Sequence, residues 1–187
     1  MAATPLRYCD AIETMAAADR ELHRVYHDTQ YGFPVTDDNI LFGRLILEIN
    51  QAGLSWTTIL KKQENFHNAY HQFQIHKVAA YTEADVARLL QDAGIIRNRL
   101  KIEAAIENAK AILQLQQTFG SFKNWLDYHH PLSKTEWTKR FKKTFRFTGG
   151  EIVNEFLVST GFLPGAHTTG CKIYKKVLKA QPAWNRG

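Results

Sequence analysis

Apolar residues recur at helical spacing along the whole chain, and this periodicity is the feature that most limits the fold. Spacings of three, four or seven residues place side chains on one face of a helix, whereas a half-buried strand needs strict alternation, which no segment sustains. The sequence therefore predicts an all-α fold. The helical spacing is clearest in four sets: Leu41, Leu45 and Ile49; Ile59, Phe66 and Tyr70; Ile102, Ile106 and Leu113; Ile152, Phe156 and Leu157.

Capping residues agree with the helical periodicity. Ser55 directly precedes an apolar helical segment, and Thr82 with Asp85 forms a variant of the capping box, in which each end of the pair bonds the other's backbone. Glycines, which commonly end helices, follow four periodic segments, at Gly53, Gly94, Gly120 and Gly161. We expect the main loops near residues 33–34, 130–131, 148–150 and 164–165.

Length and charge limit the protein class. A chain of 187 residues with 44% apolar content can bury about 70% of its unfolded surface, so we expect one domain over residues 1–187, or two joined lobes. A net charge of +6 favours a polyanionic partner, although RNA-binding proteins share it. The sequence has no signal-peptide pattern and no membrane-length apolar run, which predicts a cytoplasmic protein without membrane association.

The two cysteines, Cys9 and Cys171, lie near opposite ends of the chain. A reducing cytosol disfavours a structural disulfide between them. Metal ligation or simple burial is therefore the expectation.

Residues 85–108 have the pattern of two amphipathic helices joined by a tight turn at Gly94. In a helix-hairpin-helix motif, such a turn directs backbone N–H groups and a helix N-terminus toward a phosphate. Arg97, Arg99 and Lys101 would add positive charge. An ordinary αα-hairpin without DNA binding has the same pattern, so this segment alone does not decide between them.

Three motifs are more specific. They are Tyr26–Pro34, Glu48–Lys62 with the run Gln-Ala-Gly-Leu-Ser-Trp, and Leu90–Arg97. With these, the chain closely resembles the DNA-3-methyladenine glycosylase I family of the helix-hairpin-helix superfamily, over residues 8–171. The resemblance implies base-excision repair: hydrolytic excision of 3-methyladenine from double-stranded DNA that contains alkylated bases. It also implies a helix-hairpin-helix glycosylase fold, and we expect a monomer.

The resemblance also assigns a pocket for the flipped base. Tyr26 and Trp56 are the implied stacking faces, Tyr31 stands where the family usually has another aromatic residue, and Glu48 recognises the edge of the base. His23 stands where members often have a tyrosine beside the pocket. A cationic N3-methylated adenine would be attracted by aromatic faces and by a carboxylate. The alternative is that the aromatic residues are core and Glu48 lies on a solvated helix face.

The turn before Trp56 supplies the implied plug for the gap that a flipped nucleotide leaves. Gln51, Gly53 and Leu54 form this turn, and Leu54 is the natural wedge. A buried core leucine is the alternative.

Two absences predict a monofunctional enzyme that leaves an abasic site. Aligning the hairpin on Gly94 puts Asn98 where relatives in the superfamily carry a lysine nucleophile, so no Schiff base can form there. Asp127 fits an exposed helix residue better than a catalytic aspartate. An alkylated purine leaves as a neutral base, so positioning and electrostatic stabilisation can suffice.

The resemblance selects four metal ligands, Cys9, His27, His167 and Cys171. Together they would bind one structural zinc ion that joins segments 9–27 and 167–171. Four protein ligands leave no coordination position for water, which disfavours a hydrolytic metalloenzyme. His23 is a rival ligand, because the extra stretch 11–18 could displace Cys9.

The sequence departs from the family pattern at His23 and in residues 148–159, which include Glu151 and Asn154. These changes leave open a glycosylase for another alkylated purine, or an inactive DNA-binding relative. The basic stretch 134–146 fits a solvated amphipathic helix and a phosphate contact equally well.

Overall fold

The computed structural model describes residues 7–186, and every regular element within them is helical. The predicted all-α class is therefore confirmed. None of the helices described is long and apolar enough to cross a membrane. The α-helices are α1 (Tyr8–Ala11), α2 (Ala17–Thr29), α3 (Asp38–Gln51), α4 (Trp56–Ala69), α5 (Ile75–Ala79), α6 (Glu83–Gln91), α7 (Arg99–Phe119), α8 (Phe122–His129), α9 (Lys134–Thr144), α10 (Gly150–Ser159) and α11 (Tyr174–Lys179). The 3-10 helices are η1 (Ile12–Thr14), η2 (His71–Phe73) and η3 (Ala183–Asn185).

The chain divides into two compact units. Both ends of the chain, Met1–Pro34 and Leu157–Gly187, form one unit, called here the terminal unit. Val35–Phe156 forms the other, the central unit. The sequence predicted one domain or two joined lobes.

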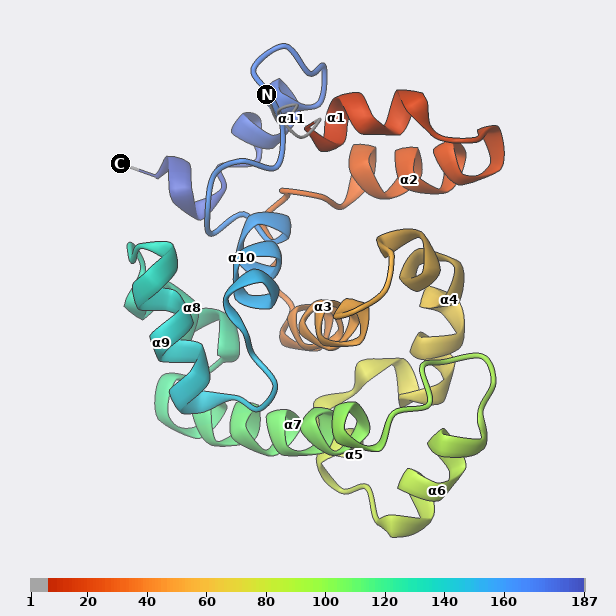
Figure 1. The fold of residues 1–187 in the computed structure, drawn as a ribbon. Helices are drawn as coiled ribbons and strands as arrows, with labels where there is room; N and C mark the ends of the chain where they lie inside the picture. The colour runs from red at the N-terminus through yellow and green to blue at the C-terminus, as the bar shows by residue number, and fades with distance from the viewer. Residues whose placement is uncertain (1–6, 187) are drawn as a thin grey trace. The chain divides into compact units, whose positions relative to one another are not determined.

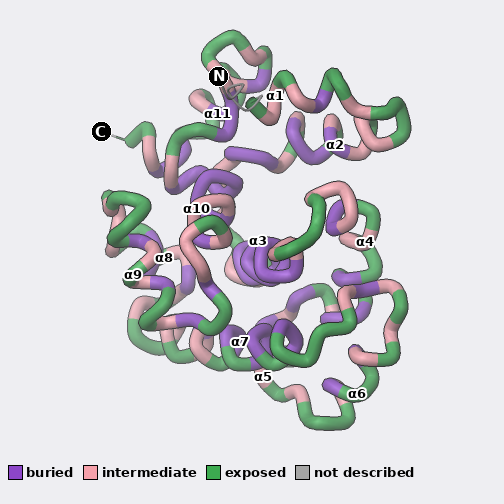
Figure 2. Tube along the Cα trace, viewed as in Figure 1, coloured by how far each residue is buried: buried purple, intermediate pink, exposed green. Residues whose placement is uncertain are grey.

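Helix α3 is the core of the central unit. Ten consecutive residues, Leu41 to Asn50, are buried, and α3 contacts α4, α5, α7 and α8. Figure 1 shows α3 end-on among these helices, and Figure 2 shows that it is buried along most of its length. A helix surrounded on all sides must be apolar on all sides, so its buried polar residues are exceptions that need an explanation. Those exceptions are Arg44, Glu48 and Asn50.

The turn between α3 and α4 is short and tightly bonded. The Leu54 N–H donates to the Gln51 carbonyl at 2.7 Å. Gly53 has φ +84°, a conformation that costs glycine least, and no other residue crowds it. Ser55 caps α4 by accepting from the Thr58 N–H at 3.2 Å, which confirms its predicted role. Leu54 is thereby held at the tip of a fixed turn.

Helices α6 and α7 contact each other and are joined by the loop 92–98, and their bounds differ from the expected 85–108. The capping box of Thr82 and Asp85 is present and α6 begins at Glu83, while α7 continues to Phe119, where Gly120 ends it with φ +83°. Lys62 of α4 donates to the carbonyls of Ala93 and Gly94 at 2.9 and 3.2 Å. The loop between the helices is therefore fixed to α4.

Helix α9 carries the predicted basic stretch and is amphipathic. Trp137, Phe141 and Phe145 of this stretch are buried, and they pack against Trp125 of α8 with ring centroids 5.6–6.3 Å apart. The lysines face outward. The aromatic residues between them thus belong to the core and do not contact a ligand.

Backbone bonds join the two chain ends within the terminal unit. The Gly32 N–H donates to the Ser159 carbonyl at 2.9 Å, which joins the N-terminal segment to the C-terminal one. Within the C-terminal segment, the Trp184 N–H donates to the Gly161 carbonyl at 3.4 Å. Gly32 has φ +81°, and a Cβ there would lie 2.5 Å from Cβ of Ala166. Only glycine allows this approach, which brings Tyr31 next to the segment that contains His167.

Candidate active site and metal centre

Glu48 is a buried carboxyl in the middle of an apolar helix. Its side chain lies on α3 and the residue is 5% exposed. Burial, together with the nearby Glu155, raises its pKa to about 8, although Arg44 one turn earlier opposes the shift. In the free protein at neutral pH, Glu48 is therefore mainly protonated and uncharged. The alternative that it lies on a solvated helix face is wrong.

The predicted plug residues lie at the end of the same helix. Leu54 is 39% exposed, so it is not a buried core leucine. The Gln51 side-chain amide donates to the Leu54 carbonyl at 3.0 Å and helps to fix the turn. Trp56 begins α4 and is partly exposed. The turn thus connects the helix that carries Glu48 with the helix that carries Trp56.

Lys101 has a different position from the one predicted. It is 6% exposed, and its ammonium donates to the carbonyls of Asn50 at 2.9 Å and Ala52 at 2.8 Å. The last carbonyls of a helix lack intrahelical partners and carry partial negative charge, so a cation there is stabilised. Lys101 therefore holds the C-terminal end of α3 and is not available for a phosphate.

The two arginines of the hairpin differ in whether they form ion pairs. Arg99 pairs with Glu83 at 2.7 Å and with Glu103 at 3.4 Å, whereas Arg97 is exposed and makes no ion pair with any described residue. Asn98 is the N-cap of α7 and accepts from the Lys101 N–H at 3.2 Å. Of the three predicted cations, Arg97 is the one left open to solvent and unpaired.

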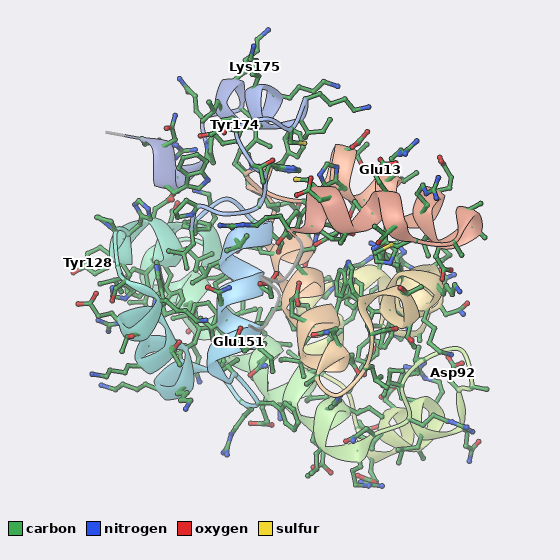
Figure 3. All side chains as sticks on the ribbon, turned by 45° about the horizontal axis from the view of Figure 1, so that its top comes forward. Glu13, Asp92, Tyr128, Glu151, Tyr174 and Lys175 are labelled. Carbon is green, nitrogen blue, oxygen red and sulfur yellow. The ribbon has the colours of Figure 1, made fainter. Side chains whose placement is uncertain are left out.

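The backbone of the hairpin loop offers two donors. The Gly94 N–H bonds to Oδ1 of Asp92 at 2.7 Å, so it faces the loop itself. Figure 3 shows Asp92 in this loop. Within the described chain, the N–H groups of Ile96 and Arg97 have no acceptor. These two amides belong to the same loop segment as the exposed Arg97.

The predicted aromatic residues of the terminal unit form a cluster. The rings of Tyr26 and Tyr31 have centroids 5.6 Å apart, and Tyr8, which the sequence analysis missed, lies 5.1 Å from the Tyr31 ring. The Tyr8 hydroxyl is 2.8 Å from Nδ1 of His23. Burial raises the pKa of Tyr8 well above its usual value, so this hydroxyl stays protonated. Only its closeness to Cys9 in sequence pointed to Tyr8.

Four residues could hold a metal ion together. The ligand atoms of Cys9, His27, His167 and Cys171 all lie within 4.8 Å of one another. Nε2 of His27 is 3.1 Å from Nδ1 of His167, 3.3 Å from Sγ of Cys9 and 3.8 Å from Sγ of Cys171. Nδ1 of His167 is 3.7 Å from each of the two sulfurs. The predicted ligand set is thus brought together, and His23, bonded to Tyr8, is not part of it.

The partners of the two histidines fit a metal site. Nδ1 of His27 is 2.7 Å from Oδ1 of Asp28, and Nε2 of His167 is 2.8 Å from the Tyr31 carbonyl. Such bonds fix the ring and leave its other nitrogen free to bind the ion. Burial also lowers the pKa of His167, which favours the neutral form that ligates metals.

Two of the residues that depart from the family pattern, Glu151 and Asn154, lie on α10. Glu151 is exposed (Figure 3). Its carboxylate pairs with Lys134 at 2.9 Å. The Asn154 amide donates to the Glu155 carboxylate at 3.1 Å. Asn154 therefore contacts the acidic residue that raises the pKa of Glu48. Asp127 is exposed on α8 and pairs with Lys123, as expected for a surface residue.

A family model described as Methyladenine glycosylase matches residues 16–142. The chain belongs to this family of DNA-base glycosylases, and the family predicted from the sequence is confirmed.

Individual relatives cover most of the chain. The DNA-3-methyladenine glycosylase 1 of Escherichia coli strain K12 is 42% identical, over 82% of this chain and 91% of its own. The DNA-3-methyladenine glycosylase of Haemophilus influenzae is 33% identical, over 82% and 92%. The solved 3-methyladenine DNA glycosylase I of Staphylococcus aureus gives a TM-score of 0.75 at 33% identity, over 81% and 90%.

Proposed function

We propose that the protein is a monofunctional DNA glycosylase that removes 3-methyladenine from alkylated double-stranded DNA and leaves an abasic site. The observation that carries this proposal is Glu48, an uncharged carboxyl buried in the core helix α3 and joined to an exposed wedge turn. In a family of methyladenine glycosylases, such a group is suited to recognise a cationic base.

Glu48 selects the substrate by charge. A neutral carboxyl in an apolar site is a poor partner for cations in general, but a cationic N3-methylated base held next to it lowers its pKa toward ionisation. The ion pair then forms only when the damaged base is fully inserted. We propose Tyr26, Tyr31 and Trp56 as stacking residues and His23 as a further contact, each assigned from family resemblance and tested by its own variant.

The chemistry needs little beyond positioning. The C1′–N9 bond breaks with its electron pair moving to the base, whose positive charge is thereby neutralised. Water adds to C1′ and loses a proton to solvent, giving the abasic sugar. Because the leaving group is a neutral purine, a fixed electrostatic environment for the developing oxocarbenium ion is sufficient.

The helix α7 offers no free lysine nucleophile at the two positions considered, which supports a monofunctional reaction. Asn98, at the position of the lysine nucleophile of related enzymes, caps α7. Lys101, the next candidate along α7, donates to two carbonyls at 2.8–2.9 Å. Base release by this protein is therefore expected without strand cleavage.

DNA contact is proposed at the wedge turn and at the hairpin. Leu54, held by Gln51 and Gly53, would fill the gap left by the flipped nucleotide. The free amides of Ile96 and Arg97, with the Arg97 guanidinium, would bind a phosphate in the manner of a helix-hairpin-helix motif.

We infer that the ion of the Cys9, His27, His167 and Cys171 cluster is a structural zinc. A tetrahedral zinc with two sulfur and two nitrogen ligands has S···N edges of about 3.5 Å and an N···N edge of about 3.3 Å. The corresponding distances here are 3.3–3.8 Å and 3.1 Å. With four protein ligands the ion would stabilise the terminal unit and take no part in the reaction.

The test is base release from methylated duplex DNA, with 3-methyladenine, 3-methylguanine and 7-methylguanine resolved by chromatography. We expect 3-methyladenine release, reduced about 100-fold in Glu48→Gln, since removing one preorganised electrostatic group typically costs 10²–10³ in rate. Glu107→Gln, an exposed glutamate of α7, is the matched control. If only another alkylated purine is released, that purine is the substrate in place of 3-methyladenine. DNA binding without release of any base would overturn the proposal.

A further inference from the structure

The loop between α9 and α10 presents an exposed aromatic side chain in a strained backbone conformation. Phe147 is 43% exposed and has φ +60°, in the left-handed region that side chains other than glycine and asparagine rarely adopt. Its neighbours Phe145 and Thr148 are buried. Strained residues of this kind persist only where the surroundings fix them, and they gather at functional sites.

Asn108 of α7 fixes this loop through two hydrogen bonds to the backbone of Arg146. It is fully buried; its amide donates to the Arg146 carbonyl at 3.1 Å and its carbonyl accepts from the Arg146 N–H at 2.7 Å. On the other side of Phe147, the Thr148 hydroxyl donates to the Phe145 carbonyl at 3.3 Å. The ring is therefore displayed by a rigid loop.

The surface around the ring is hollowed and basic. On one side a pocket is lined by Lys142, Arg146, Phe147, Thr148, Gly149 and Ile152, with no acidic residue. Among described residues, the side chains of Lys142, Lys143 and Arg146 make no ion pair. A second hollow, between Phe147 and Leu100, is lined by Glu103 and Glu107, whose carboxylates pair with Arg99 and Lys110. The first side thus favours an anion beside an apolar ring.

Lys101 connects this loop with the wedge turn. Its ammonium lies 6.0 Å from the centre of the Phe147 ring, and it also donates to the Asn50 and Ala52 carbonyls at the base of that turn. The Phe147 ring and the base of the turn that carries the exposed Leu54 therefore both lie near one buried ammonium.

We propose that Phe147 is a second apolar contact to the DNA, packing on the sugars and exposed base faces where Leu54 opens the duplex, with Arg146 and Lys142 on the adjacent phosphates. This inference rests on the proposed function, because it takes as partner the same lesion-containing duplex. Stacking on an aromatic side chain tolerates any base, so the contact would strengthen binding without adding sequence preference.

The experiment measures binding to a duplex with a stable abasic analogue by fluorescence anisotropy, at several salt concentrations. Phe147→Asn removes the ring but accepts the left-handed backbone. We expect binding about tenfold weaker with an unchanged salt slope, and recovery in Phe147→Tyr. Arg146→Gln should instead lower the salt slope by about 0.9.

The control is Tyr128→Asn, which removes an aromatic side chain that is 72% exposed on α8 (Figure 3) and should leave affinity unchanged. Melting temperature and circular dichroism show whether each variant folds. If Phe147→Asn does not fold, Phe147→Tyr tests the inference instead. Full affinity of Phe147→Tyr, with fluorescence of the new tyrosine quenched by bound DNA, supports the contact. Unchanged affinity in a folded Phe147→Asn, or an unquenched Phe147→Tyr, overturns the inference. A wild type that neither binds this duplex nor releases 3-methyladenine refutes the proposed function instead.

Discussion

Replacing Glu48 with glutamine should remove a pH dependence of folding stability that the wild-type protein carries. The carboxyl has a pKa of about 8 in the folded protein, against 4.5 ordinarily. Between these values the folded state holds a proton that the unfolded state has lost, so the free energy of unfolding falls as pH rises. The contribution is fully present below pH 4.5 and is lost once the pH passes about 8.

The size of the effect follows from the width of this window. Each pKa unit corresponds to about 1.4 kcal/mol, so the loss accumulates to roughly 5 kcal/mol between pH 4.5 and pH 8. Glutamine has the same shape and no titrating group, so Glu48→Gln should lose the slope and keep the fold. Its stability relative to wild type should rise as pH increases.

Urea denaturation at half-unit steps from pH 5 to pH 9 measures this difference. Slopes from the other titrating groups are common to both proteins and cancel in the comparison. The reasoning is refuted if the difference in the free energy of unfolding between wild type and Glu48→Gln is the same at pH 5 and at pH 8.5.

Three further predictions concern other parts of the molecule. Lys101→Met should lower the free energy of unfolding by about 2–4 kcal/mol, because two charge-assisted hydrogen bonds to the end of α3 are lost; a chemical denaturation curve like that of wild type would contradict this. Cys9→Ala should reduce zinc to well under one ion per chain and lower the melting temperature, as measured by elemental analysis and calorimetry; unchanged values of both would exclude the metal site. Arg97→Gln should lower the salt slope of DNA binding by about 0.9, whereas Arg99→Gln, which breaks existing ion pairs, should change it less; equal slopes in the two variants would argue against the hairpin contact.

The sequence predicted the helical class and the local caps well, because these depend on neighbouring residues. Ser55, and Thr82 with Asp85, cap the helices expected of them, since a cap needs only a side chain and a backbone N–H three residues apart. The C-terminal end of α7 was predictable as well, because Gly120 follows the periodic segment that contains Leu113 and ends the helix with φ +83°.

The roles of charged residues in the hairpin were not predictable in the same way. Lys101 bonds to carbonyls 49 and 51 residues away, and Arg99 pairs with Glu83 across the hairpin, so neither partner is visible in local sequence. The metal cluster was found through family resemblance, since its four ligands are widely separated along the chain. The exposed ring of Phe147 had no signal in the sequence, because its left-handed backbone depends on a distant asparagine.

The terminal unit, built from both ends of the chain, has a consequence for how the protein is made on the ribosome. His27 and His167 are separated by 140 residues, so at a synthesis rate of 5–20 residues per second the first pair of ligands waits roughly 7 to 28 s for the second. The central unit can fold as it emerges, while Cys9 and His27 have no completed site. During that interval the Cys9 thiol is open to oxidants and to competing metals, which makes the nascent chain the stage at which oxidative or metal stress would most reduce the yield of this repair enzyme.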